Sequence, residues 1–270
     1  TSSVVEQGNQ LRVDLYGYQM MARSEDQGST WTWLSDRTVR SVVVKPDDPS
    51  IRYGLNGVVL YRSSDGGLSY DSLTSIWSDF SPTQLAVSPA APDRVYALLP
   101  STSQTGLGKV AISEDQGQTF TYGTGSTLLW AYSGLWSAFA VSPTDPDLIL
   151  AGGIYLGRST DGGQTWTSAH ALNLGEANYM HVDHRHVLIT ANGAWSANDG
   201  GINYAPVPAE TWEDRTADMV LSFITDIDRS PVDPAVFAFG AWHNCRTSSV
   251  NGQPSSIFLG DSFNVAIDEQ

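Results

Sequence analysis

An all-β fold of repeated four-stranded antiparallel sheets is predicted by two markers that recur in step along the 270-residue chain. The first is an eight-residue pattern that contains a small polar residue, an aspartate, a glycine and an aromatic residue. Its aspartates lie 39, 50, 46 and 38 residues apart, which suits one β-propeller blade per repeat and is too long for leucine-rich repeats. The copies occupy 24–31, 63–70, 113–120, 159–166 and, in degraded form, 197–204.

The second marker is an apolar strand that runs into a pair of prolines. Proline cannot donate a hydrogen bond to a sheet ladder, so each pair predicts the end of a strand and a turn after it. This marker occupies 42–49, 86–92, 140–146 and 227–234. At roughly 45 residues per blade, the chain has length for about six blades.

We expect these blades to form one domain over 1–270, with irregular first and last blades. The first has no proline pair and the last has no aspartate pattern, as is typical of terminal repeats. The alternative is an incomplete propeller that is a fragment of a longer chain, since the sequence begins at Thr1 rather than at methionine. The expected blades cover 1–36, 37–77, 78–130, 131–174, 175–212 and 213–270.

A structural role is expected for the repeated aspartates. An aspartate caps backbone amides in a tight turn, and a glycine that follows supplies a positive φ. The aromatic residue can then bury its ring between adjacent sheets. None of these roles requires a ligand. The aspartates are Asp26, Asp65, Asp115, Asp161 and Asp199.

The pattern Ser-x-Asp-x-Gly-x-Thr-Trp, with the proline pair ahead of it, resembles the repeats of Asp-box (bacterial neuraminidase repeat) β-propellers over almost the whole chain. That superfamily includes sialidases, xyloglucan-active glycoside hydrolases, sortilin-type receptors, photosystem II assembly factors and many uncharacterised secreted proteins, and the chain is most similar to the last group. The resemblance therefore implies the fold and not one function. Together with the acidic composition, it implies a secreted or cell-surface location.

The enzymes of that superfamily can be tested against the chain. Sialidases carry an Arg-Ile-Pro or Arg-Leu-Pro motif, and neither occurs here. Xyloglucan-active hydrolases are more similar, best seen over 141–166. However, they place catalytic aspartates across a cleft between two propellers, and this chain has length for one. Sortilin-type receptors have a larger propeller followed by a cysteine-rich module, which does not fit a chain with a single cysteine.

The charge balance excludes two classes of partner. With 14 basic and 29 acidic residues, the formal charge of −15 repels nucleic acids and anionic membrane surfaces. The apolar stretches are strand-length, so we expect no membrane insertion. We also expect no cofactor. The partners that remain are a glycan or an extracellular protein, or other subunits of a homo- or hetero-assembly.

Candidate functional residues lie in the loops that lead into the strands before the proline pairs, because such loops gather on one face of a propeller. Aromatic rings there can stack on sugar rings, or they can simply pack the loops. With His181 as a further polar contact, the candidate ligand-binding residues are Trp77, Trp130, Tyr132, Trp136, Trp212 and His181.

Carboxylates occur in the same loops. Glycoside hydrolysis needs two of them roughly 5–10 Å apart, and solvated acids on the rim are the alternative interpretation. The catalytic candidates are Asp36, Asp79, Glu176 and Asp214, with Asp218 beside them.

Histidines concentrate in 180–189. In an extended strand, His181 and Asp183 would share one face and His184 and His186 the other, and either pair could contribute to a metal site. Two ligands do not make a site, so no metal is assigned. A hydrogen-bonded strand that lines the channel and a polar binding site are the other interpretations of this segment.

Two hypotheses follow. The first is a non-catalytic extracellular propeller that binds a glycan or a protein, or acts as a structural subunit. The second is a glycoside hydrolase, similar to xyloglucanases, that uses carboxylates on the channel face.

Overall fold

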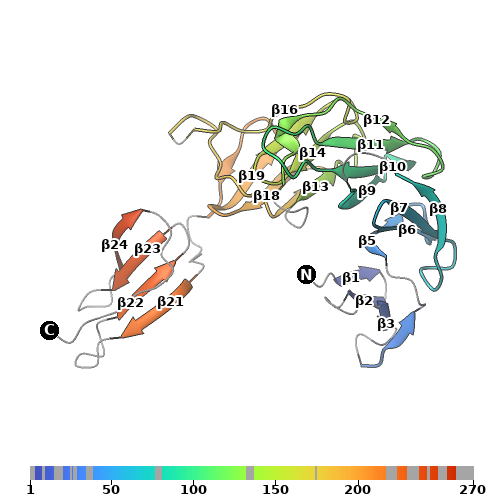
Figure 1. Ribbon diagram of the computed structural model, residues 1–270, viewed down its shortest axis with the longest axis horizontal. Helices are drawn as coiled ribbons and strands as arrows, with labels where there is room; N and C mark the ends of the chain where they lie inside the picture. The colour runs from blue at the N-terminus through green and yellow to red at the C-terminus, as the bar shows by residue number, and fades with distance from the viewer. Residues whose placement is uncertain are drawn as a thin grey trace. The chain divides into compact units, whose positions relative to one another are not determined.

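The structure is a computed structural model, and it describes residues 4–7, 10–14, 21–24, 26, 29–34, 39–76, 81–131, 137–173, 175–216, 224–229, 237–241, 244–248 and 254–259. Apart from one short 3-10 helix, η1 (Thr127–Leu129), the elements of this part of the chain are β-strands (Figure 1). The prediction of an all-β fold is confirmed.

The strands form six four-stranded antiparallel sheets, which we call blades 1 to 6 in chain order. Blade 1 contains β1 (Val4–Gln7), β2 (Gln10–Asp14), β3 (Met21–Ser24) and β4 (Thr32–Leu34). Blade 2 contains β5 (Arg40–Lys45), β6 (Asp48–Asn56), β7 (Val59–Ser63) and β8 (Asp71–Ser75). Blade 3 contains β9 (Gln84–Ser88), β10 (Ala91–Leu99), β11 (Lys109–Ser113) and β12 (Thr121–Tyr122). Blade 4 contains β13 (Ala138–Val141), β14 (Ile149–Gly152), β15 (Leu156–Ser159) and β16 (Thr167–Ser168). Blade 5 contains β17 (His186–Ile189), β18 (Gly193–Asn198), β19 (Gly201–Pro206) and β20 (Glu213–Asp214). Blade 6 contains β21 (Ile224–Arg229), β22 (Phe237–Ala241), β23 (Asn244–Ser248) and β24 (Pro254–Leu259).

These sheets are the blades of a β-propeller, as the repeat spacing predicted. One boundary differs, because β20 completes blade 5, whereas residues 213 and 214 were expected to open the last blade. By their contacts the residues form two compact units, Thr1–Asp214 with blades 1 to 5 and Arg215–Gln270 with blade 6. The single domain over 1–270 stays a prediction.

In blades 2 to 5 the first strand is the inner one. β5 contacts β9, β9 contacts β13, and β13 contacts β17. Among the described residues, Pro46, Pro89 and Pro143 lie between the first and second strands of their blades, whereas Pro49 and Pro92 are the second residues of β6 and β10 (Figure 1). The strands ahead of the proline pairs of blades 2 to 4 therefore face the centre of the propeller, as we expected.

Each middle blade contributes to two cores. Along β10, Val95, Ala97 and Leu99 pack in the cluster shared with blade 2. Tyr96 and Leu98 pack in the cluster shared with blade 4. Side chains alternate between the faces of a strand, so a strand between two blades is buried on both faces and reads as a continuous apolar run. A third cluster joins blades 4 and 5 through residues such as Leu150, Ala194 and Trp212.

The strand order also sorts the connections into two ends. Strands alternate in direction, so the first-to-second and third-to-fourth connections lie at one end, which we call the turn end. The second-to-third connections and the links between blades lie at the opposite end, the loop end. The repeated aspartates of blades 1 to 4 follow the third strand and so belong to the turn end.

Candidate functional site

The aspartates at the turn end are held by short hydrogen bonds within their own turns. Asp161 Oδ1 accepts from Thr165 N at 2.9 Å and from Ser159 Oγ at 2.7 Å, and Oδ2 accepts from Thr165 Oγ1 at 2.5 Å. Ser159 Oγ in turn accepts from Gly163 N at 2.8 Å. The φ angles of Gly162 and Gly163 are 71° and 91°, a region that favours glycine. The carboxylate thus closes the turn.

The same pattern recurs in three other blades. Asp26, Asp65 and Asp115 each accept a hydrogen bond from a backbone amide and a hydroxyl four residues ahead. Hydrogen bonds from Thr119 and Ser113 lower the pKa of Asp115 to about 2. Partial burial acts to raise the pKa of Asp65, but hydrogen bonds from Ser69, Ser63 and Leu68 outweigh it and bring the pKa to about 2. These carboxylates are ionised acceptors with their lone pairs engaged, which is poor chemistry for a general acid.

The fifth copy does not form this turn. Asp199 lies between β18 and β19, the second and third strands of blade 5, and therefore at the loop end. Its carboxylate pairs with the guanidinium of Arg185 at 3.0 Å. The position four residues ahead is Asn203, whose Oδ1 accepts from Asn198 Nδ2 at 2.9 Å. Without a Ser or Thr hydroxyl there, the aspartate lacks its usual donor. The predicted equivalence of Asp199 with the other four aspartates is wrong.

The loop end carries an aromatic pair between blades 3 and 4. Trp130 lies in the link between the blades and Tyr155 in the β14–β15 connection, and their ring centroids are 5.9 Å apart with planes tilted by 55°. Ile154 N donates to Trp130 O at 3.0 Å, which fixes the two segments against each other. Both side chains are half-buried. Sequence reasoning selected Trp130 and missed Tyr155, although the second-to-third connections necessarily reach the same end.

Trp212 is placed differently from the expectation of a stacking platform. Its side chain is 6% exposed in the core between blades 4 and 5, and its Nε1 donates to Ala169 O at 3.0 Å. With its ring packed and its N–H satisfied, Trp212 offers no face to a ligand. The other aromatic candidates, Trp77, Tyr132 and Trp136, lie outside the described residues.

The catalytic candidates that the structure describes are not at the channel. Asp214 is exposed in β20, the outermost strand of blade 5. Glu176 is exposed, and its carboxylate accepts from Asn173 Nδ2 at 2.6 Å. Glu176 lies two residues before Asn178, whose side chain hydrogen-bonds to the backbone of Glu210 and Trp212 just ahead of β20. Both carboxylates therefore lie at the outer side of blade 5, and neither lies on the channel face as we expected. Asp36, Asp79 and Asp218 lie outside the described residues.

The histidine-rich segment is a strand only from His186 onward. Asp183 has a φ of 65°, and the backbone N–H groups of Asp183 and His184 donate to Ile154 O and Gly153 O of blade 4. The alternation expected from position 181 therefore breaks, with His184 fully buried and His186 exposed. These two histidines do not share a face, so that proposed ligand pair is excluded. His181 and Asp183 are half-buried at the loop end.

His184 instead meets a histidine that the sequence did not single out. Its Nε2 lies 3.1 Å from His170 Nε2, and its Nδ1 lies 2.7 Å from Ser196 Oγ. His170 Nδ1 lies 2.7 Å from Ala171 O, an acceptor, so this nitrogen carries the hydrogen of neutral His170 and its Nε2 accepts. His184 then donates from Nε2 and accepts at Nδ1 from the Ser196 hydroxyl. Both imidazoles are satisfied as neutral rings.

Burial lowers the pKa of both histidines. His170 is 3% exposed and His184 is 0% exposed. Desolvation, with added repulsion from His170 and His181, lowers the pKa of His184 to about 3. Desolvation also lowers the pKa of His170, against a smaller opposing effect of its hydrogen bond with Ala171. No sequence pattern marked His170, which lies two residues after the last strand of blade 4.

Among the described residues, no group of three or more His, Cys, Asp or Glu side chains is arranged to hold a metal ion. The same part of the chain has no helix of the length and hydrophobicity needed to cross a bilayer.

The fold and its two ends define a β-propeller, and comparisons with known proteins agree with that class. No known family profile matches the chain. It is 30% identical over 156 residues to a probable oligoxyloglucan-reducing end-specific xyloglucanase from Neosartorya fischeri. The aligned region covers 53% of this chain and 18% of that protein. The chain thus spans about a fifth of this relative.

Solved propellers share the fold at low sequence identity. The GH74 enzyme of Niastella koreensis has a TM-score of 0.62 and 17% identity over 95% of this chain and 42% of its own. An ancestral GH74 enzyme has a TM-score of 0.61 and 13% identity over 97% and 39% of the two chains. YCF48 bound to a D1 peptide has a TM-score of 0.53 and 18% identity over 88% and 74%.

Proposed function

We propose that this chain is an Asp-box β-propeller of the secreted or cell-surface type, and that its loop end binds a plant-type β-glucan such as xyloglucan without cleaving it. The observation that carries the proposal is the half-buried Trp130–Tyr155 pair in two connections of the loop end. Aromatic rings suit the apolar C–H face of a pyranose. The partial relationship to a xyloglucanase supports a glucan as the ligand.

A non-catalytic role is favoured by the position of the acids. Glu176 and Asp214 lie at the outer side of blade 5, away from the aromatic pair at the seam of blades 3 and 4. Hydrolysis would need two carboxylates flanking a sugar bound at the aromatic pair. A glycoside hydrolase is the second candidate, favoured by the xyloglucanase relationship alone. Peptide binding is a third outcome, because YCF48 binds a D1 peptide on a similar fold.

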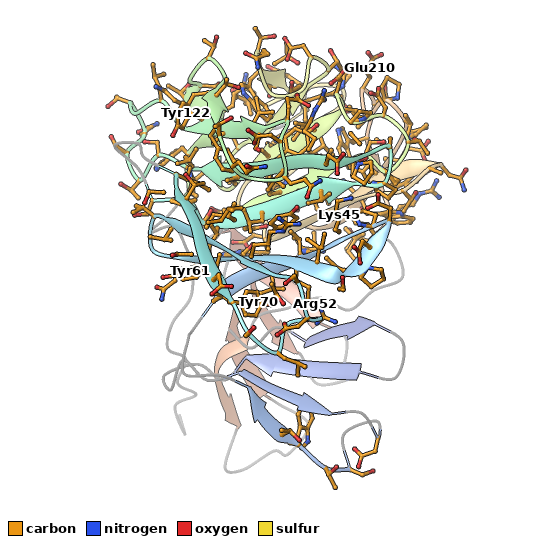
Figure 2. All side chains as sticks on the ribbon, turned by 90° about the vertical axis from the view of Figure 1, so that its right-hand side faces the viewer. Lys45, Arg52, Tyr61, Tyr70, Tyr122 and Glu210 are labelled. Carbon is orange, nitrogen blue, oxygen red and sulfur yellow. The ribbon has the colours of Figure 1, made fainter. Side chains whose placement is uncertain are left out.

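The test is titration of the intact protein with xyloglucan oligosaccharides by calorimetry. Trp130→Ala and Tyr155→Ala are each expected to weaken binding about tenfold, the effect of losing roughly 1.4 kcal/mol of ring contact. Tyr122→Ala is the matched control, because Tyr122 is 39% exposed on β12, the outermost strand of blade 3 (Figure 2). Its affinity should equal that of the wild type.

Two results would overturn the proposal. Equal glucan affinity in the wild type and both ring variants, all folded, would remove the aromatic pair as the contact. Release of new reducing ends from xyloglucan would replace binding by hydrolysis.

A further inference from the structure

A long connection covers the seam between blades 4 and 5. We call residues 171–173 and 175–183, between β16 and β17, the strap. Met180 of the strap is 1% exposed in the core shared by the two blades. Asn178 Nδ2 donates to Glu210 O at 3.0 Å, and Asn178 Oδ1 accepts from Trp212 N at 2.6 Å. The strap is thus folded down along blade 5 and shields apolar side chains from water.

The two ends of the strap are joined by the buried histidine pair. His170 directly precedes the strap and His184 directly follows it, and their rings lie 5.0 Å apart. Ser196 of β18 fixes His184 from blade 5, while Ser168 Oγ donates to His170 O at 2.7 Å from blade 4. The pair therefore closes a loop whose other contacts are hydrogen bonds and apolar packing.

Among the described residues, no acidic side chain is one of the groups that shift the pKa of His184 or His170. The groups that act on His184 are His170 and His181, which repel its protonated form. Ser196 on β18 is neutral, and so are Gly153 and Ile154 on the β14–β15 connection, which meet this segment through their backbones.

The charged neighbours in the chain are Asp183 and Arg185. Asp183 is half-buried and adjoins His184 through the backbone, and Arg185 is directed to Asp199. A protonated imidazole at position 170 or 184 would also place an extra N–H donor in a hydrogen-bond chain that is already satisfied. A buried charge without a partner is costly, so the closed pair requires two neutral rings.

We propose that the His170–His184 contact is an acid-sensitive clasp, which holds the strap closed near neutral pH and releases it when an imidazole gains a proton. Release exposes Met180 and loosens the seam between blades 4 and 5. The strap ends at His181 and Asp183 at the loop end, so acid release would also alter the proposed binding face. That consequence rests on the proposed function, whereas the clasp itself does not.

The size of the effect follows from proton linkage. An opened strap binds a proton with an ordinary histidine pKa near 6.5, whereas the closed form resists protonation. Between pH 7 and pH 5, uptake of one proton on opening lowers the protection of strap amides by about 25-fold. Uptake by both histidines would lower it further.

The experiment is hydrogen–deuterium exchange of the ligand-free intact protein at pH 7 and pH 5, with each rate divided by its intrinsic chemical exchange rate. Peptides spanning 171–183 are expected to lose about 25-fold in protection. Wild-type strap protection that is equal at the two pH values would overturn the proposal. Glucan titration at pH 7 is a separate measurement, so failure of either idea is distinguishable.

Variants separate the clasp from general acid sensitivity. The double variant H170Q/H184Q carries neutral side chains at both positions, so its strap protection should be independent of pH, and each single variant should lose part of the wild-type change. H186Q is the matched control, since His186 is exposed outside both the pair and the strap, and it should keep the wild-type loss. If the double variant does not fold, H170Q and imidazole nitrogen NMR of the wild type decide. A hydrogen on His170 Nδ1 and on His184 Nε2 supports the clasp, and titration of both near pH 6.5 contradicts it.

Discussion

The Asp161 turn shows how one carboxylate orders eight residues. The side chain accepts from a backbone amide and from two hydroxyls, and one of those hydroxyls accepts from Gly163 N. Each neutral hydrogen bond is worth about 1 kcal/mol net, and bonds to an ionised acceptor are worth more.

Removal of that carboxylate should therefore destabilise the propeller. Asp161→Ala is expected to lower the free energy of unfolding by about 2 kcal/mol, comparable to loss of a helix cap. Urea denaturation of the full chain measures it. Thr160→Ala in the same turn is the control, because Thr160 is exposed, and it should cost less than about 0.5 kcal/mol. Equal effects of the two substitutions would contradict the structural role.

At this scale, sequence patterns identified the residues whose chemistry is local. Asp65, Asp115 and Asp161 could be found because the turn contains all of their partners. Asp199 was assigned to the wrong kind of turn, because its partner Arg185 lies outside the eight-residue pattern. His170 was not found at all, since its partner is His184, and nothing in the sequence indicates that two strap ends meet.

Neighbouring blades approach each other closely where β12 ends. Thr124 N donates to Gln164 O at 2.9 Å, which links blade 3 to the turn of blade 4. A Cβ at Gly123 would lie 1.9 Å from Gly163 O. Only a glycine lets the two backbones come this close.

Gly123→Ala should consequently separate blades 3 and 4. We expect a loss of about 3 kcal/mol in the free energy of unfolding, since the clash is with backbone and not with a flexible side chain. Gly57→Ala is the comparison, because Gly57 has a φ of 58° and no atom within 4 Å of a built Cβ. Its cost is conformational and should be about 1 kcal/mol. Thermal denaturation of both variants checks the order, and the reverse order would contradict the close approach.

A basic side chain links each middle blade to the next at the turn end. Lys45 Nζ, which is buried, lies 3.0 Å from Asp93 of blade 3 (Figure 2). Arg94 reaches Asp147 of blade 4 at 2.8 Å, and Arg158 reaches Glu210 of blade 5 at 2.8 Å. Exposed ion pairs contribute about 0–1 kcal/mol each. Their use is to fix the angle between blades, and sequence spacing gave no sign of them because each pair joins different repeats.

Stability of the whole molecule should fall with acid in two steps. The pKa of His184 is lowered to about 3 by desolvation and by repulsion from His170 and His181. A histidine with a lowered pKa contributes its full stability above pH 6.5, and the contribution is lost as pH falls toward 3. The slope is about 1.4 kcal/mol per pH unit for each proton.

The second step belongs to the turn aspartates. The pKa of Asp115 is lowered to about 2 by hydrogen bonds from Thr119 and Ser113, so its contribution is complete above pH 3.8 and is lost below it. Urea midpoints at pH 7.5, 5 and 3 should decline between the first two values and again below pH 4. In H170Q the decline between pH 7.5 and 5 should shrink. An identical decline in that variant would assign the first step to other groups.

The period of the aspartates and the proline pairs was enough to predict six sheets, because each repeat encodes one sheet and its two marked hairpins. The loop end was harder to predict. Its connections differ in length from blade to blade, so the strap carried Glu176 to the outer side of blade 5, although regular repeats placed it at the channel.

The alternation along β10 has a consequence for how the propeller unfolds. Val95, Ala97 and Leu99 belong to one core, and Tyr96 and Leu98 belong to the next. Loosening this single strand opens two interfaces together, so damage in blade 3 must also be felt in blades 2 and 4. Although the molecule is assembled from repeats, its middle blades should melt as one cooperative unit.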